Sequence, residues 1–93
     1  MHKLQIYVEN DCWSCEESLS IAAETQARFE NVEVVIIDLL NDERPDPVFA
    51  VPTYVLNGRI ISLGNPRREA LWDQLARTIK LARDASDANG GAE

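Results

Sequence analysis

Two cysteines separated by two residues, Cys12 and Cys15, are the side chains of this sequence best suited to chemistry. Cysteines at this spacing can close a small disulfide ring, and a helix N-terminus can stabilise the thiolate that opens one. Between them, the ring of Trp13 could contact a substrate or pack on a neighbouring loop. The hydroxyl of Ser14 could donate to a thiolate or simply begin a helix. The pattern indicates thiol–disulfide exchange.

Two other roles for the cysteine pair remain open at this point. A structural staple is one, although so short a loop removes little entropy from the unfolded chain and would stabilise poorly. A metal site is the other, and a closed site normally needs four thiolate or imidazole ligands. His2 is the only other ligand of that kind, so two chains would have to share their cysteine pairs. We expect no metal and no cofactor.

The elements around the cysteines follow from hydrophobic periodicity. Alternating apolar residues predict a strand over 3–8, directly before the pair. From Cys12 onward the spacing changes to three and four, which predicts a helix with acidic residues in its first turn. The expected inner face of that helix carries Cys15, Leu19, Ala22, Gln26 and Phe29. A β-branched run over 32–37 then predicts a strand buried on both faces and parallel to the first.

The second half of the chain carries clearer turn signals. Prolines at 45 and 47 rule out a long helix there, leaving room for one helical turn over 40–43. Asn57-Gly58 predicts a hairpin between strands over 53–56 and 59–63, because both residues tolerate positive φ angles. A last helix is expected with Asn65 as N-cap and Pro66 after it. Its predicted inner face consists of Leu71, Leu75, Ile79 and Ala82.

This order of elements, with the cysteine pair after the first strand and Val51-Pro52-Thr53 opening the third, resembles the thioredoxin-like superfamily over residues 3–83. The resemblance implies an α/β fold with a mixed four-stranded sheet flanked by helices. The chain is similar to a minimal, glutaredoxin-sized member of that superfamily. We expect one thioredoxin-like domain over 1–84 and a flexible tail over 85–93.

The resemblance also implies roles for individual residues. Cys12 would be the nucleophile and Cys15 the resolving cysteine, with Trp13, Ser14, Val51 and Pro52 contacting substrate. It further implies a cis peptide bond before Pro52, against the low general frequency of that isomer. A trans proline that merely opens an edge strand is the alternative.

The sequence departs from the family pattern in three places. Ile6 stands where thioredoxins carry a buried carboxylate, so proton transfer to Cys15 would need water or another group. Asp11 precedes Cys12 where glutaredoxins place a basic residue, and Gly64-Asn65-Pro66 replaces their Gly-Gly-Asp turn. We therefore do not expect glutathione dependence. Arg67 and Arg68, at the start of the last helix, could meet an anion, but solvation is the expected role.

Composition limits the partners. The 93 residues and 45% apolar content are sufficient for one small domain with a core. A formal charge of −7 disfavours nucleic acid and anionic membranes as partners. Without a signal-like or membrane-spanning segment, we expect a cytoplasmic monomer. Its function would be to reduce protein disulfides with electrons from an unidentified reductase. The alternative function is an interaction module with a non-catalytic or regulatory cysteine pair.

Overall fold

The computed structural model describes residues 1–9, 14–39 and 51–91, with the backbone alone over 86–91. The elements within these ranges are β1 (His2–Val8), α1 (Cys15–Arg28), β2 (Val32–Asp38), β3 (Thr53–Leu56), β4 (Arg59–Leu63) and α2 (Arg68–Gly91). They form a mixed four-stranded sheet with two helices, which confirms the predicted α/β class. The predicted turn over 40–43 lies outside the described residues.

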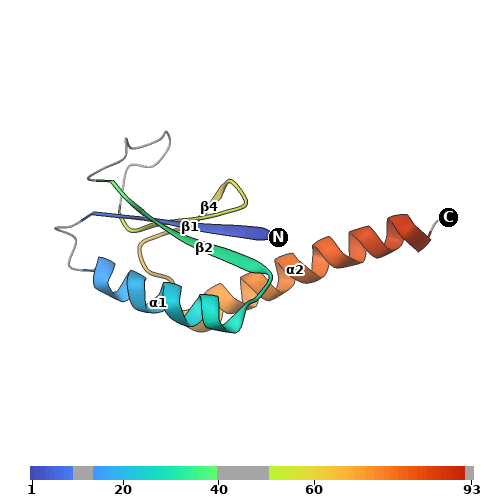
Figure 1. Ribbon diagram of the computed structural model, residues 1–93, viewed down its shortest axis with the longest axis horizontal. Helices are drawn as coiled ribbons and strands as arrows, with labels where there is room; N and C mark the ends of the chain where they lie inside the picture. The colour runs from blue at the N-terminus through green and yellow to red at the C-terminus, as the bar shows by residue number, and fades with distance from the viewer. Residues whose placement is uncertain (10–13, 40–50, 92–93) are drawn as a thin grey trace.

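The strands are ordered β2-β1-β3-β4 across the sheet. β1 is parallel to β2 and antiparallel to β3, and β3 continues into the antiparallel hairpin with β4. Figure 1 shows both helices on one side of this sheet, with α2 extending well beyond it. The molecule is accordingly elongated, with principal dimensions of 53 × 26 × 17 Å.

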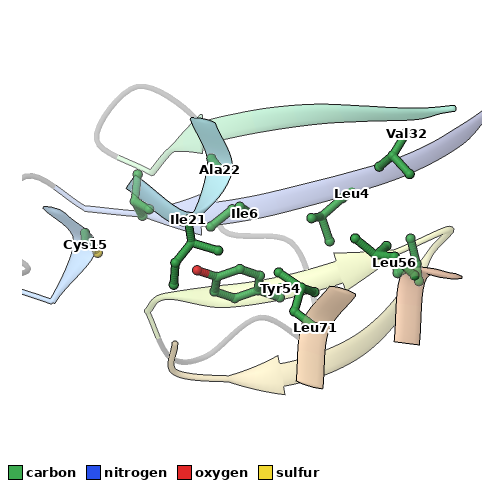
Figure 2. Packing of buried hydrophobic residues seen from close by; sticks show 11 residues of the cluster. Leu4, Ile6, Cys15, Ile21, Ala22, Val32, Tyr54, Leu56 and Leu71 are labelled. Carbon is green, nitrogen blue, oxygen red and sulfur yellow. The ribbon is translucent and has the colours of Figure 1, made fainter. Parts of the chain in front are cut away.

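The main core lies between the sheet and the two helices (Figure 2). Because side chains alternate along a strand, every second residue of β1 and β3 points toward the helices. The buried members of this cluster are Leu4, Ile6, Val8, Cys15, Ile21, Ala22, Val32, Tyr54, Leu56, Leu71 and Leu75. A smaller cluster on the opposite face contains Tyr7 and Val55, with Ile37 and Leu39 packed against them.

The inner face of α1 differs from the predicted one. Leu19 is 51% exposed, whereas Ser18 and Thr25 are fully buried. The predicted inner face did not include these two hydroxyl residues, but each has a hydrogen-bond partner inside the protein, which makes its burial tolerable. The helix therefore turns a partly polar face toward the sheet.

β2 was expected to be buried on both faces, and this prediction was wrong. The strand lies at the edge of the sheet, and Ile36 is 37% exposed. The side-chain amide of Gln26 contacts the strand's backbone, donating to the Val32 carbonyl at 2.7 Å and accepting from the Val34 N–H at 2.9 Å. Gln26 thus satisfies edge groups that no neighbouring strand meets.

The predicted hairpin between β3 and β4 is confirmed. Asn57 and Gly58 have φ angles of 51° and 86°, the positive values that a type I′ turn requires. The Asn57 side chain also accepts the backbone N–H of Lys3 at 2.9 Å. The turn is in this way fastened to the start of β1.

Both ends of α2 differ from expectation. The helix begins at Arg68 and not directly after Asn65, whose side chain is used elsewhere. It continues to Gly91, where a flexible tail was predicted from the absence of apolar periodicity. Backbone hydrogen bonds define a helix whether or not one face is apolar, so periodicity alone did not mark its end. Within the described residues, neither helix combines the length and apolar character needed to cross a bilayer.

Candidate active site

Cys15 is the first residue of α1 and lies in the main core, only 5% exposed. It is disulfide-bonded. Ser14 is the N-cap of the helix, but its hydroxyl makes no capping hydrogen bond. The first cysteine of the pair, Cys12, precedes the helix in the chain and lies outside the described residues, as does Trp13.

The side chain of Asn65 contacts the backbone at the start of α1. Its Nδ2 donates to the carbonyl oxygen of Ser14 at 2.7 Å, across 51 positions of sequence. That carbonyl also accepts the Ser18 N–H, at the longer distance of 3.4 Å. The first turn of α1 is therefore held by a residue from the loop between β4 and α2.

Asn65 is itself held by two buried hydroxyl groups. Its Oδ1 accepts hydrogen bonds from Ser18 Oγ at 2.6 Å and from the Tyr54 hydroxyl at 2.8 Å. Both donors are fully buried, and Figure 2 shows the Tyr54 hydroxyl pointing away from β3 toward α1. Without an acceptor, each buried hydroxyl would destabilise the fold by about 1–3 kcal/mol. Burial raises the pKa of Tyr54, so this phenol remains a donor at neutral pH.

The start of β3 joins the same structure through the neighbouring glycine. The N–H of Gly64 donates to the carbonyl of Pro52 at 2.7 Å, and Gly64 adopts a φ of 100° that favours glycine. The peptide bond between Val51 and Pro52 is cis, the isomer that the resemblance implied. Pro52 is buried and Val51 is half-buried against the core. Gly64 and Asn65 thus connect Pro52 with Ser14.

Charged side chains lie on the solvent-facing side of the contacts around Asn65. Arg68 donates to Glu17 at 2.6 Å and to Glu24 at 2.8 Å, which joins the start of α2 to two turns of α1. The hydrogen bond from Arg68 to Glu24 lowers the pKa of that carboxyl. The expectation that Arg68 is merely solvated was therefore wrong. Glu16 and Glu17 line an open hollow together with Ser14, Gly64 and Asn65.

The structure shows what surrounds Ile6, the residue that stands where the resemblance led us to look for a buried carboxylate. Ile6 is fully buried and is the cross-strand partner of Tyr54. Where the family pattern has a carboxylate, this chain has an aliphatic side chain beside a residue that bears a hydroxyl. The polar side chains of Ser18, Tyr54 and Asn65 are hydrogen-bonded to one another behind the first turn of α1.

Sequence reasoning missed these three residues. Asn65 was interpreted as a helix cap for α2, and Ser18 and Tyr54 were not singled out. A usable signal was present, since Ser18 lies one turn after Cys15 and Tyr54 directly precedes the apolar pair Val55-Leu56. A buried hydroxyl on each of two elements requires a partner. Among the described side chains, no group of three or more His, Cys, Asp or Glu could hold a metal ion.

Solved structures with the same fold are thioredoxin-like. Mitochondrial thioredoxin 3 of Saccharomyces cerevisiae, in its oxidized form, aligns with a TM-score of 0.65 and 24% identity, covering 82% of this chain and 77% of that one. The periplasmic thioredoxin SoxS of Paracoccus pantotrophus, in its reduced form, aligns with a TM-score of 0.64 and 22% identity, covering 88% and 99%.

A third structure concerns thiol resolution in the yeast mitochondrial 1-Cys peroxiredoxin by the glutathione and thioredoxin systems. One of its chains aligns with a TM-score of 0.64 and 21% identity, covering 82% of this chain and 77% of that one. No protein-family model and no curated protein matches the sequence. The fold of this chain is thioredoxin-like, as the sequence resemblance predicted.

Proposed function

We propose that this protein is a thiol–disulfide oxidoreductase that reduces disulfide bonds of proteins. The observation that carries the proposal is the position of Cys15, a disulfide-bonded cysteine buried at the first residue of α1 in a thioredoxin-like fold. A buried second cysteine suits the resolving step, because its thiolate would attack the mixed disulfide from within the protein and is not open to disulfides in solvent. The first cysteine, Cys12, would be the nucleophile.

The reaction consists of two exchanges. The thiolate of Cys12 attacks one sulfur of a substrate disulfide, a mixed disulfide forms, and the other substrate sulfur leaves as a thiolate. The thiolate of Cys15 then attacks the Cys12 sulfur and releases the second substrate thiolate. The substrate gains two electrons and two protons, and the protein is left with a disulfide. A reductase that supplies two electrons must regenerate the dithiol.

The substrate would lie along the segment that precedes β3. Val51 is half-buried beside the core, and Pro52 is connected to Ser14 through Gly64 and Asn65. This connection supports the proposal that Ser14, Val51 and Trp13 line one substrate surface, with Pro52 buried behind it. An extended peptide could pair with the Val51 backbone, as in other strand-addition complexes.

Insulin reduction in the presence of dithiothreitol tests the proposal. We expect the wild-type protein to accelerate precipitation of the insulin B chain, and Cys12→Ser and Cys15→Ser to reduce the rate to that of dithiothreitol alone. In a separate incubation with insulin and no dithiothreitol, reduced Cys15→Ser should also retain a mixed disulfide that is visible on a non-reducing gel, whereas Cys12→Ser should not.

Leu19→Ala is a suitable control, because Leu19 is exposed on α1 away from the core. This variant should keep the wild-type rate. A wild-type protein that gives no acceleration, together with a Cys15→Ser variant that traps nothing, would contradict the proposal and favour an interaction module.

A further inference from the structure

A polar cluster with two fully buried hydroxyls and one partly exposed amide lies directly behind the first turn of α1. It consists of Ser18, Tyr54 and Asn65, which come from α1, β3 and the loop before α2. The Asn65 amide makes three hydrogen bonds in this cluster. Its oxygen accepts from the two hydroxyls, and its nitrogen donates to the backbone at the start of α1. The exchange reaction as described above assigns none of these residues a role.

The cluster fixes the orientation of the Asn65 amide. A flipped amide would place its oxygen against the Ser14 carbonyl, which has no proton to donate, so the nitrogen must face Ser14 and the two hydroxyls donate to the oxygen. The bond to Ser14 is therefore oriented by two fully buried hydroxyls, although Asn65 itself is partly exposed.

The Ser14 carbonyl belongs to the peptide group that joins Ser14 to Cys15. Its intrahelical bond to the Ser18 N–H is long at 3.4 Å, and the Ser14 hydroxyl provides no cap. The 2.7 Å bond from Asn65 is therefore the shortest contact described for this peptide group. The free N–H groups of a first helical turn stabilise an anion only while they stay directed toward it.

We propose that Asn65 is a positioning residue for dithiol exchange, holding the Ser14–Cys15 peptide group so that the first turn of α1 stabilises the Cys12 thiolate. The inference rests on the proposed function. It adds a residue outside the cysteine motif that sets the reactivity of that motif. Glu16 and Glu17 on α1 and Arg68 on α2 also act electrostatically near this turn, and they remain unchanged in every comparison below.

The test measures the rate of alkylation by iodoacetamide against pH in a Cys15→Ser background, where Cys12 is the only thiol. We expect Asn65→Ala to raise the pH midpoint by about half a unit, the size of a helix-terminus effect. Asn65→Asp keeps both hydroxyl contacts but replaces the donor with a negative charge, and should raise the midpoint by about one unit.

The matched control is Thr25→Val, which removes a fully buried hydroxyl at the other end of α1. It should lower the melting temperature without moving the midpoint. If Asn65→Ala does not fold, Tyr54→Phe removes one of the two donors that orient the amide and should give a smaller rise.

Asn65 variants that melt earlier but keep the wild-type midpoint would overturn the inference, because such a result describes a structural role alone. Alkylation requires no substrate turnover. A shifted midpoint in a protein without insulin reductase activity would therefore support the positioning role and reject the proposed function. An unshifted midpoint in a protein that has insulin reductase activity would reject the positioning role and support the proposed function.

Discussion

The two ends of α1 are anchored by different chemistry. At the N-terminal end, the small polar side chain of Asn65 meets the Ser14 carbonyl. At the C-terminal end, the large ring of Trp72 packs against the core and its Nε1 donates to Thr25 Oγ1 at 3.0 Å. The guanidinium of Arg28 lies 4.6 Å from the centre of the same ring.

The two ends of α1 therefore make different contributions: contacts at one end mainly stabilise the fold, and contacts at the other mainly orient the backbone. The aromatic contact at the C-terminal end buries apolar area, which contributes most to the free energy of folding. The hydrogen bonds at the N-terminal end contribute less energy but fix the direction of a peptide group. Changes at the two ends should therefore be distinguishable by what they alter.

The largest effect on stability is expected at the aromatic end. Trp72→Ala should lower the free energy of unfolding by about 2–3 kcal/mol, somewhat below the range for fully buried aromatic residues because Trp72 is half-buried. Urea denaturation followed by circular dichroism measures this change. Cys12 should keep its alkylation midpoint, and a shift of that midpoint would break the separation between the two ends.

An intermediate effect is expected for Tyr54→Phe, which deletes one hydroxyl of the polar cluster. Its cost at neutral pH should be about 1 kcal/mol. Burial raises the pKa of Tyr54, so above its ordinary value near 10 the unfolded chain loses a proton that the folded protein retains. Wild-type stability should fall as the pH rises through that region.

The variant lacks this titration, so the stability difference between the two proteins should narrow from pH 8 to pH 11. Thermal denaturation over that range, with Tyr7 present in both proteins, measures it. A difference that stays constant would show that the Tyr54 hydroxyl does not titrate differently in the folded and unfolded states.

The smallest effect is expected for Glu24→Gln, at the ion pair that joins α1 to Arg68. The pKa of Glu24 is lowered, so its contribution is present above the unfolded value of about 4.5 and disappears as the pH falls through the folded value. The variant should be slightly less stable at pH 7 and equal to wild type near pH 3. Asp73→Asn, in a highly exposed pair with Arg77, is the control and should change nothing.

Local signals predicted the strands, the hairpin and the fold class. Alternation over Leu4, Ile6 and Val8 and the Asn57-Gly58 turn are properties of neighbouring residues, and the structure confirms both. The edge position of β2 was not predictable in the same way. A β-branched run is typical of a central strand, but the order of strands depends on contacts far apart in the sequence.

The candidate site was predictable only in its motif. The cysteine pair and the Val51-Pro52 segment are visible in the sequence, whereas the position of Asn65 depends on where three separate elements meet. Asn-Pro before a helical pattern is a common cap signal for the helix that follows. Here the Asn65 side chain instead donates to the Ser14 carbonyl at the start of α1. Polar partners across 51 positions cannot be deduced from one sequence without its fold.

The projecting half of α2 has a consequence for how the molecule behaves in solution. Its radius of gyration is 14.6 Å. A compact chain of this length is expected to have a value near 12 Å. Such a shape tumbles anisotropically, so amide relaxation rates should depend on the angle between each N–H vector and the α2 axis. Small-angle scattering would show the same extension as a long tail in the distribution of interatomic distances.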